Sequence, residues 1–406
     1  MSATAKASST ANSPAIDYPV YDCDHHFYEP PEAFLRHLPK QYQSYFQYVT
    51  LANGRTKLLI DGVLSDYIPN PTFNVVAAPG SHENFYRGTN PESLTLLQMG
   101  KPIKSEPAFH NGAAHLKVMD EQNVQVAVIF PTLASVIEER LSHKPDVINA
   151  LFHSLNQWVA EEYGFTNGRQ FPVAAICLSD INAAMQELEF VIGAGCKFVQ
   201  IRPAPVPGPF GGRSLGSREF DPFWARCEEA GIIVTQHVGD SGYDYLHRMW
   251  TGGETKEWHP FESDAFREAL DTLGRPAADA IASLVCGGVF DRFPKLRIAA
   301  VEAGSAWLEP LLKRLALAYK KLPKSFGSDP VKAVKDHLWI MPFYEESAKE
   351  LGELLGMDKV LFGSDWPHPE GLAQPLDYFA DIADLSPADQ RKVMSDNLKN
   401  LIEGRV

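Results

Sequence analysis

Acidic and imidazole side chains stand at the ends of four short apolar runs of the sequence. These side chains are Asp24 and His26, His237, Glu302, and Asp365. Carboxylate and imidazole groups together form a mixed oxygen and nitrogen ligand set that suits Zn²⁺, Mn²⁺ or Fe²⁺. If the fold brings the four run ends together, the sequence predicts a divalent metal site.

The apolar runs have the length and composition of parallel strands that are buried on both faces. Eight of them follow one another, at residues 20–26, 124–130, 171–177, 197–201, 232–237, 296–301, 338–341 and 360–363. Helical segments separate most of the runs, at 114–122, 145–163, 181–194, 222–230, 306–321, 345–356 and 387–402. This alternation predicts an α/β fold, a (β/α)₈ barrel of the TIM type. A doubly wound sheet is the alternative, but Asp, His and Glu occupy its usual glycine-rich first turn.

The predicted barrel is one unit over residues 18–406, preceded by a disordered tail at 1–17. Residues 31–110 are rich in proline and aromatic side chains and are too long for an ordinary connection. We therefore interpret them as an insertion or cap after the first strand.

Functional side chains of such barrels project from the carboxyl ends of the strands. Because residues two apart on a strand face the same way, Asp24 and His26 are expected to point inward, and Cys23 and His25 outward. We predict Asp24, His26, His237 and Asp365 as metal ligands. The alternative is that a single strand-end His or Asp has only a structural, hydrogen-bonded role.

Several groups near these ligands have predicted supporting or proton-transfer roles. Asp365 beside the metal, or Glu302 across the mouth, is expected to exchange a proton with substrate, each contributing about 10²- to 10⁴-fold. His368 follows Asp365 closely and is counted with them as catalytic. His25 and Glu29 are expected to support the ligands from behind.

Four motifs carry a resemblance to a known family. They are DCDHHFYEP at 22–30, TQHVGD at 235–240, GGVFDRFPKLRIAAVEAGSAW at 287–307 and FGSDWPH at 362–368. Together they resemble the amidohydrolase-related (amidohydrolase 2) family, which includes aminocarboxymuconate semialdehyde decarboxylase and the resorcylate-type decarboxylases. The resemblance spans roughly residues 18–402. It implies a metal-centred barrel, often dimeric or tetrameric, that catalyses non-oxidative decarboxylation, hydration or hydrolysis.

The sequence departs from that family pattern at two positions. The first-strand H-x-H of many members corresponds here to Asp24-x-His26, which makes the site more anionic and favours Mn²⁺ or Fe²⁺ over Zn²⁺. Glu302 stands where several decarboxylases carry a catalytic His, so their mechanism does not transfer directly.

Three functions remain open at this stage. The first is a metal-dependent hydrolase or non-oxidative decarboxylase that acts on a small carboxylated or aromatic substrate. The second is an O₂-activating di-iron hydroxylase, in which His25, Glu29, Glu302 and His368 help to hold a second metal beside a paralogous subunit. The third is a structural or regulatory subunit that keeps the barrel without catalysis.

Substrate contacts are expected from loops around the barrel mouth. Residues 31–110 and 238–263 supply aromatic side chains, and Arg248 offers a planar cation for a carboxylate. We predict Arg248, Trp250 and His259 as substrate-binding residues. The alternative is that these aromatics pack a loop or an oligomer contact, either with a second copy or with a paralogous chain.

Composition excludes several classes of partner. The 37 Lys and Arg against 51 Asp and Glu among 406 residues give a net charge of −14, which disfavours binding to nucleic acid. The start of the chain lacks the apolar stretch of a signal peptide, and no window is apolar enough for a membrane span. Five scattered cysteines without a C-x-x-C pair indicate reduced thiols. These features predict a cytoplasmic protein with a small-molecule substrate.

Overall fold

The computed structural model of the chain describes residues 16–65, 67–90, 93–208, 211–252 and 262–405. Residues 1–15 of the predicted tail lie outside these ranges, and so does the predicted substrate residue His259. Ile16 and Tyr18 pack against the main hydrophobic core. Packing therefore begins close to the predicted start of the domain.

The predicted strands pair in parallel, as their apolar composition indicated. One sheet has the order β1 (Val20–Phe27), β7 (Val124–Pro131), β8 (Gln170–Pro172). The other has the order β15 (Leu338–Ile340), β14 (Arg297–Val301), β13 (Ile233–His237), β10 (Phe198–Gln200), β9 (Ala174–Ala175). Only Val173 separates β8 from β9, and its N–H donates to the carbonyl of Ile129 (2.9 Å). The two sheets are therefore continuous through this one predicted run.

The eighth predicted run, at 360–363, forms no strand of its own. The N–H of Leu361 donates to the carbonyl of Ile340 (2.9 Å), and the N–H of Cys23 donates to the carbonyl of Phe362 (2.8 Å). The run therefore lies hydrogen-bonded between β15 and β1. This contact brings its polar continuation, from Ser364 onward, next to the end of β1.

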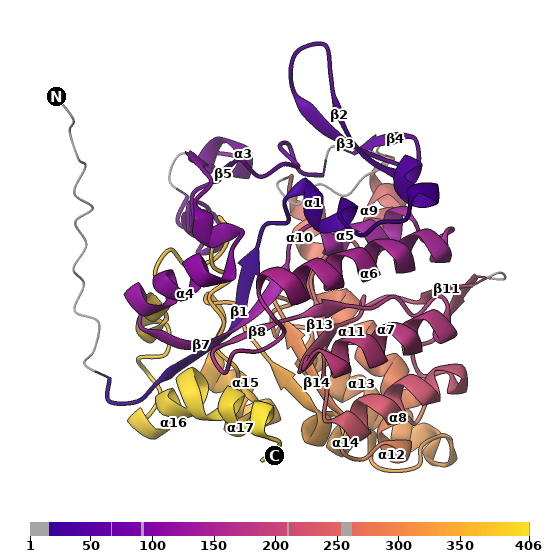
Figure 1. Cartoon of the computed structure of the whole chain (residues 1–406). Coiled ribbons are helices and arrows are strands. Elements are labelled where there is room, and N and C mark those ends of the chain that lie inside the picture. The colour runs from indigo at the N-terminus through magenta and orange to yellow at the C-terminus, as the bar shows by residue number, and fades with distance from the viewer. Residues whose placement is uncertain (1–15, 66, 91–92, 209–210, 253–261, 406) are drawn as a thin grey trace.

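Helices follow most of the parallel strands, and Figure 1 shows α6, α7 and α8 side by side along one side of the strands. The helices after residue 110 are α4 (Gly112–Glu121), α5 (Ala134–Arg140), α6 (Pro145–Glu162), α7 (Ile181–Gly193), α8 (Asp221–Ala230), α9 (Asp244–Thr251), α10 (Ala265–Leu270), α11 (Gly274–Cys286), α12 (Val289–Arg292), α13 (Leu308–Lys321), α14 (Pro330–His337), α15 (Ala348–Leu355), α16 (Pro387–Arg391) and α17 (Asn397–Glu403). A short antiparallel pair, β11 (Val206–Gly208) and β12 (Gly211–Arg213), interrupts this series.

The last predicted helix, at 387–402, is divided. A π-helical turn at Lys392–Asp396 separates α16 from α17. Ser386 caps the start of α16, because its Oγ accepts a hydrogen bond from the N–H of Asp389 (3.2 Å). A π turn contains one residue more than an α turn, and a helix predicted from a 3.6-residue period does not include such a turn.

Side chains of the strands separate into two buried clusters, one on each face. Val126, Val128 and Phe130 of β7 belong to the inner cluster, and Ala127 and Ile129 belong to the outer one. Burial on both faces confirms the interpretation of these runs as strands covered on both sides. All five cysteines are free, and of these only Cys286 is exposed.

A bulge in β1 corrects one predicted orientation. Asp22 pairs with Ala127 and His25 pairs with Ile129, so the two residues between them oppose a single residue of β7. Cys23 consequently packs in the inner cluster, although strict alternation predicted that it points outward. A β-bulge inserts one extra residue and re-aims its neighbours. Asp24 and His26 still share the inner face as predicted.

Residues 31–110 contain more regular structure than their composition indicated. They begin with α1 (Pro31–Leu35) and form a three-stranded antiparallel sheet of β2 (Phe46–Thr50), β3 (Thr56–Ile60) and β4 (Val63–Ser65). A two-stranded sheet of β5 (Val75–Ala77) and β6 (Pro102–Lys104) follows, with α2 (Glu83–Tyr86) and α3 (Leu96–Met99) between its strands. Phe34, Phe46, Phe73 and Phe109 of this segment are buried in the outer core cluster. The segment is therefore packed onto the strands and helices of the parallel sheets.

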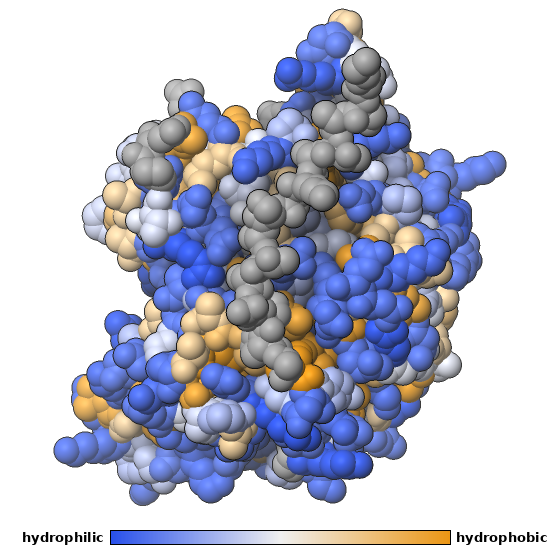
Figure 2. Space-filling view, turned by 90° about the vertical axis from the view of Figure 1, so that its left-hand side faces the viewer, coloured by the Kyte–Doolittle hydropathy of each residue, from blue (hydrophilic) through white to orange (hydrophobic). Residues whose placement is uncertain are grey.

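The face of the molecule in Figure 2 is mainly hydrophilic, with some hydrophobic side chains gathered near its middle. Among the described residues, no helix has the length and apolar composition needed to cross a bilayer.

Candidate metal centre

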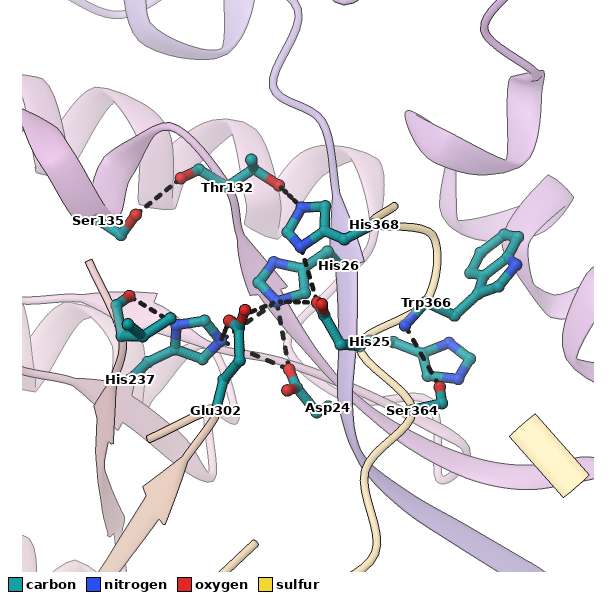
Figure 3. A network of polar contacts seen from close by, with 12 residues as sticks. Asp24, His25, His26, Thr132, Ser135, His237, Glu302, Ser364, Trp366 and His368 are labelled. Atoms are coloured by element: carbon teal, nitrogen blue, oxygen red, sulfur yellow. Dashed lines mark hydrogen bonds and ion pairs between the residues drawn. The ribbon is translucent and has the colours of Figure 1, made fainter. Parts of the chain in front are cut away.

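The structure brings the four predicted ligands to one place at the carboxyl end of β1, and Figure 3 shows three of them, Asp24, His26 and His237. His26 Nε2 lies 3.1 Å from His237 Nε2, 3.2 Å from Asp24 Oδ1 and 3.3 Å from Asp365 Oδ1. β1 supplies Asp24 and His26, β13 ends in His237, and Asp365 follows the run at 360–363. The predicted convergence of strand ends therefore places nitrogen and oxygen atoms around a common centre.

Glu302, which follows β14, lies within the same cluster. Its Oε2 is 3.1 Å from His237 Nε2 and 3.9 Å from His26 Nε2. Two overlapping groups of possible ligands result, both of which contain His26 and Glu302. One adds Asp24 and His237, and the other adds Asp365 and His368. Glu302 was predicted as a catalytic residue, and the geometry also offers it as a ligand.

The hydrogen bonding of the cluster fits a bound cation. Both carboxylate oxygens of Asp24 are buried and form no hydrogen bond that meets the usual geometry among the described residues, although Oδ1 lies 3.2 Å from His26 Nε2 and 3.4 Å from His237 Nε2. A buried carboxylate without a partner is costly, so it calls for a counter-ion. His237 Nδ1 donates to the carbonyl of Val238 (2.9 Å), which leaves the lone pair of Nε2 facing the cluster. A buried carboxylate and an imidazole nitrogen with a free lone pair are the electron-pair donors that a divalent metal ion requires.

The negative charges of three neighbouring acids, Asp24, Glu302 and Asp365, also favour a bound cation. Burial raises the pKa of Glu302 and of Asp365 well above the ordinary carboxyl value, and the charge of Asp24 raises both further. Burial also acts to raise the pKa of Asp24, but contacts with His237 and His26 outweigh it and hold that pKa below its ordinary value. Binding of a divalent ion is therefore expected to release protons from Glu302 and Asp365.

The backbone holds two of these acids in strained conformations. Glu302 has φ 51° and Asp365 has φ 55°, a left-handed region that side-chain-bearing residues seldom adopt. Strain of this kind persists where surrounding structure fixes it, and it concentrates at functional sites. Gly363 allows the chain to approach β1, because a Cβ there would lie 2.7 Å from Asp24 Cβ.

A polar group behind β1 fixes the floor of the site. Asp22 Oδ1 accepts the N–H groups of Asp24 and Ser364 (both 3.0 Å). Asp22 Oδ2 contacts His25 Nε2 (3.2 Å), and His25 Nδ1 contacts His115 Nε2 (3.0 Å). His25 thus lies behind the ligands, as predicted. The role of His115 could not be predicted, because nothing local marks a contact across 90 residues.

Glu29 supports the site from a second direction. Its carboxylate accepts the backbone N–H groups of Thr132 (3.2 Å), Leu133 (2.9 Å) and Ala134 (3.0 Å) at the start of α5. Burial raises the pKa of Glu29 to about 7, although these hydrogen bonds lower it. The acid therefore positions the loop that carries Thr132.

The contact with Thr132 in turn shows which ring nitrogen of His368 carries a hydrogen. Thr132 Oγ1 donates to the carbonyl of Phe27 (3.0 Å), so it accepts from His368 Nε2 (2.9 Å). The other ring nitrogen, Nδ1, lies 2.7 Å from Asp365 Oδ1. A hydrogen must lie between these two atoms, carried by an imidazolium or by a protonated carboxyl. The Asp365 and His368 pair therefore holds one transferable proton next to the cluster.

A cavity of about 430 Å³ lies over the cluster. His26, His237, Glu302, Asp365 and His368 form its polar floor. Aromatic side chains that the sequence analysis did not single out stand around this floor: Tyr28, Tyr67, Phe73, Tyr86, Phe343 and Tyr344. Glu370, two residues after His368, was also missed, although its place after FGSDWPH could have marked it.

The predicted substrate residues do not line this cavity in the described part of the chain. Arg248 is on α9 and forms an ion pair with Asp244 (3.3 Å). Trp250, on the same helix, is 79% exposed. From the predicted loop 238–263, only Val238 and Gly239 are among the described lining residues. The segment 31–110, by contrast, contributes much of the cavity wall, as its aromatic content suggested.

Comparison with known proteins places this geometry in a family. Curated relatives include a 2-amino-3-carboxymuconate-6-semialdehyde decarboxylase from Dictyostelium discoideum, 23% identical over 63% of this chain and 67% of the relative. A gamma-resorcylate decarboxylase from Rhodococcus jostii (strain RHA1) is 24% identical over 71% of this chain and 86% of the relative.

Solved structures extend the likeness. An amidohydrolase from Mycobacterium avium subsp. paratuberculosis K-10 has a TM-score of 0.89 and 38% identity, covering 96% of this chain and 100% of its own. A dihydroxybenzoic acid decarboxylase from Polaromonas sp. JS666, solved with manganese and 2-nitroresorcinol, shares the fold at a TM-score of 0.57 and 15% identity, covering 96% and 98%. The amidohydrolase family model matches residues 21–397. The chain therefore belongs to the amidohydrolase family.

Proposed function

We propose that this protein is a metal-dependent enzyme that removes or hydrolyses a carboxyl-derived group of an aromatic substrate, with non-oxidative decarboxylation as the leading reaction. The observation that carries the proposal is the buried Asp24 carboxylate, which lacks a hydrogen-bond partner and faces two imidazole nitrogens. The decarboxylase relatives support the choice of reaction. The hydrogen-bonded run at 360–363 supports a closed (β/α)₈ barrel, with residues 31–110 as its cap.

Asp24, His26, His237 and Asp365 would hold the ion, and Glu302 is the further ligand that the geometry offers. With three carboxylates against two imidazoles, the donor set is harder than that of a histidine-rich zinc site and favours Mn²⁺ or Fe²⁺ over Zn²⁺. When bound, such an ion supplies a Lewis acid that orients and polarises substrate oxygens.

Protein groups supply the proton that decarboxylation needs. The carbon that loses CO₂ must receive a proton, and the Asp365 and His368 pair holds one at the cavity floor. Ionised Asp365 beside an imidazolium His368 would leave that proton on the ring, ready for transfer. Glu302, across the floor, is placed to take a proton from a substrate hydroxyl.

A direct test uses protein loaded with Mn²⁺ and a panel of hydroxylated benzoic acids in D₂O, followed by NMR. The proposal predicts loss of the carboxyl group and one deuterium at the vacated ring carbon. Hydrolysis of aryl esters or amides without decarboxylation would identify hydrolysis as the reaction, which the proposal also includes. No turnover of either class by metal-loaded protein would contradict it and favour a non-catalytic subunit.

A second candidate follows from the two overlapping ligand groups, which share His26 and Glu302. Of these two, a carboxylate such as that of Glu302 could be shared by two metal ions, and with iron such a pair would supply the chemistry of an O₂-dependent hydroxylase. Elemental analysis separates the candidates: about one ion per chain supports the decarboxylase or hydrolase, and about two irons with O₂ consumption supports the hydroxylase.

A further inference from the structure

The cavity wall is much less polar than its floor. Ile68, Val75, Val76, Leu96 and Leu97 form an apolar surface that comes from the segment after β1. The volume of about 430 Å³ falls in the range of cavities that enclose drug-sized ligands. A wall of this size and composition fits a ligand larger than a single substituted ring.

The charge of the cavity has one sign. Glu302, Glu345, Asp365 and Glu370 line it, whereas no lysine or arginine does so among the described residues. Arg87 stacks on the Tyr344 ring (4.5 Å), but its guanidinium is bound to Asp381 and Glu83. One divalent ion offsets only part of this negative charge, so a second anionic group on a ligand would meet no cation in this part of the protein.

Glu370 is the acid with unused hydrogen-bonding capacity. Its Oε2 is buried and has no hydrogen-bond partner among the described residues. Burial raises the pKa of Tyr28, Tyr67 and Tyr86, and the negative charge of Glu370 raises each further. Glu370 lines the cavity together with these tyrosines and with the residues of the floor. A donor on a bound ligand would satisfy it.

We propose, on the basis of the function proposed above, that the substrate is a bulky, mainly apolar molecule with a single anionic group. That group meets the metal ion, the body packs on the wall from residues 68–97, and a hydroxyl or amine donates to Glu370. Molecules with a second carboxylate are disfavoured by the acids of the wall and floor.

The test is a calorimetric titration of the Mn²⁺-loaded protein with matched acids: benzoate, 2-naphthoate, the hydroxy-2-naphthoates and naphthalene-2,6-dicarboxylate. We expect 2-naphthoate to bind about tenfold more tightly than benzoate, because the second ring buries apolar area. At least one hydroxy isomer should gain a further severalfold, and the dicarboxylate should bind about tenfold more weakly than 2-naphthoate.

The Glu370→Gln variant tests how much the carboxylate of Glu370 contributes to ligand binding. It should abolish the gain of the best hydroxy isomer and reduce the penalty on the dicarboxylate to about threefold, since neutral partners form weaker hydrogen bonds than charged ones. Glu353→Gln, an exposed acid of α15, is the matched control and should leave all affinities unchanged.

The outcomes separate this inference from the proposed function. Equal binding of mono- and dicarboxylate, or of benzoate and 2-naphthoate, by protein that keeps its metal ion would overturn the inference alone. So would a Glu370→Gln variant whose affinities match the wild type. Failure to retain the ion would contradict the proposed function itself.

Discussion

The floor and the wall of the cavity are built in opposite ways. Floor residues come from the carboxyl ends of parallel strands and from the residues after the run at 360–363, and two of them have a polar contact outside the cluster, His237 with the carbonyl of Val238 and His368 with Thr132. The wall comes from short antiparallel strands and loops of residues 67–102, and its members are mostly apolar. Chemistry and selectivity are therefore separable here: substitutions in the floor should remove the ion or the reaction, whereas substitutions in the wall should change only what binds.

The largest effect is expected at the floor, from His237→Ala. Loss of one imidazole next to the orphaned Asp24 should lower metal content from about one ion per chain to below about 0.1. Elemental analysis of the purified variant measures this, and circular dichroism should show an unchanged fold. His143→Ala, on an exposed His that pairs with Asp61, is the control. Full metal content in His237→Ala would contradict this division of roles, because a floor residue would then be dispensable.

His368→Gln should separate catalysis from metal retention within the floor. The variant loses the proton shared with Asp365, so turnover of a carboxylate substrate should fall about 10²- to 10⁴-fold while the ion stays bound. Rates and metal content are measured on the same sample. Unchanged turnover would mean that the proton comes from another group.

Glu29→Gln tests the support of the floor through pH. Because burial raises the pKa of folded Glu29 to about 7 from an ordinary 4.5, the folded state binds the proton more tightly than the unfolded state. This contribution to stability is complete below about pH 4.5 and is lost as pH rises through about 7, by up to about 3 kcal/mol. Urea unfolding of the metal-free proteins should therefore show wild type losing stability relative to Glu29→Gln over this window. A difference that does not change with pH would contradict this view of Glu29.

The smallest effect is expected at the wall. Val76→Ala removes two methyl-sized groups from the apolar surface and should weaken 2-naphthoate binding about fivefold, at roughly 0.8 kcal/mol per group or less. Metal content should not change. A Val76→Ala variant that loses its ion would show that wall and floor are coupled.

More of the floor than of the wall could be predicted from the sequence. Asp24, His26, His237 and Asp365 could be predicted because the carboxyl ends of parallel strands meet at one edge, whatever the loops do. The bulge that turns Cys23 inward could not be predicted, because a strict two-residue alternation does not indicate an extra residue. Tyr67 and Glu370 were missed because their position depends on how long, irregular segments pack. Arg248 and Trp250 stood out by residue type, but α9 carries them away from the cavity lining.

The central claim is that a divalent ion binds between β1, β13 and the residues after the run at 360–363. Crystals grown with Mn²⁺ and measured at the manganese absorption edge test this claim directly. We predict an anomalous peak about 2.0–2.3 Å from His26 Nε2, His237 Nε2 and an oxygen of Asp24. A peak elsewhere, or none at this position in crystals saturated with Mn²⁺, would contradict the account.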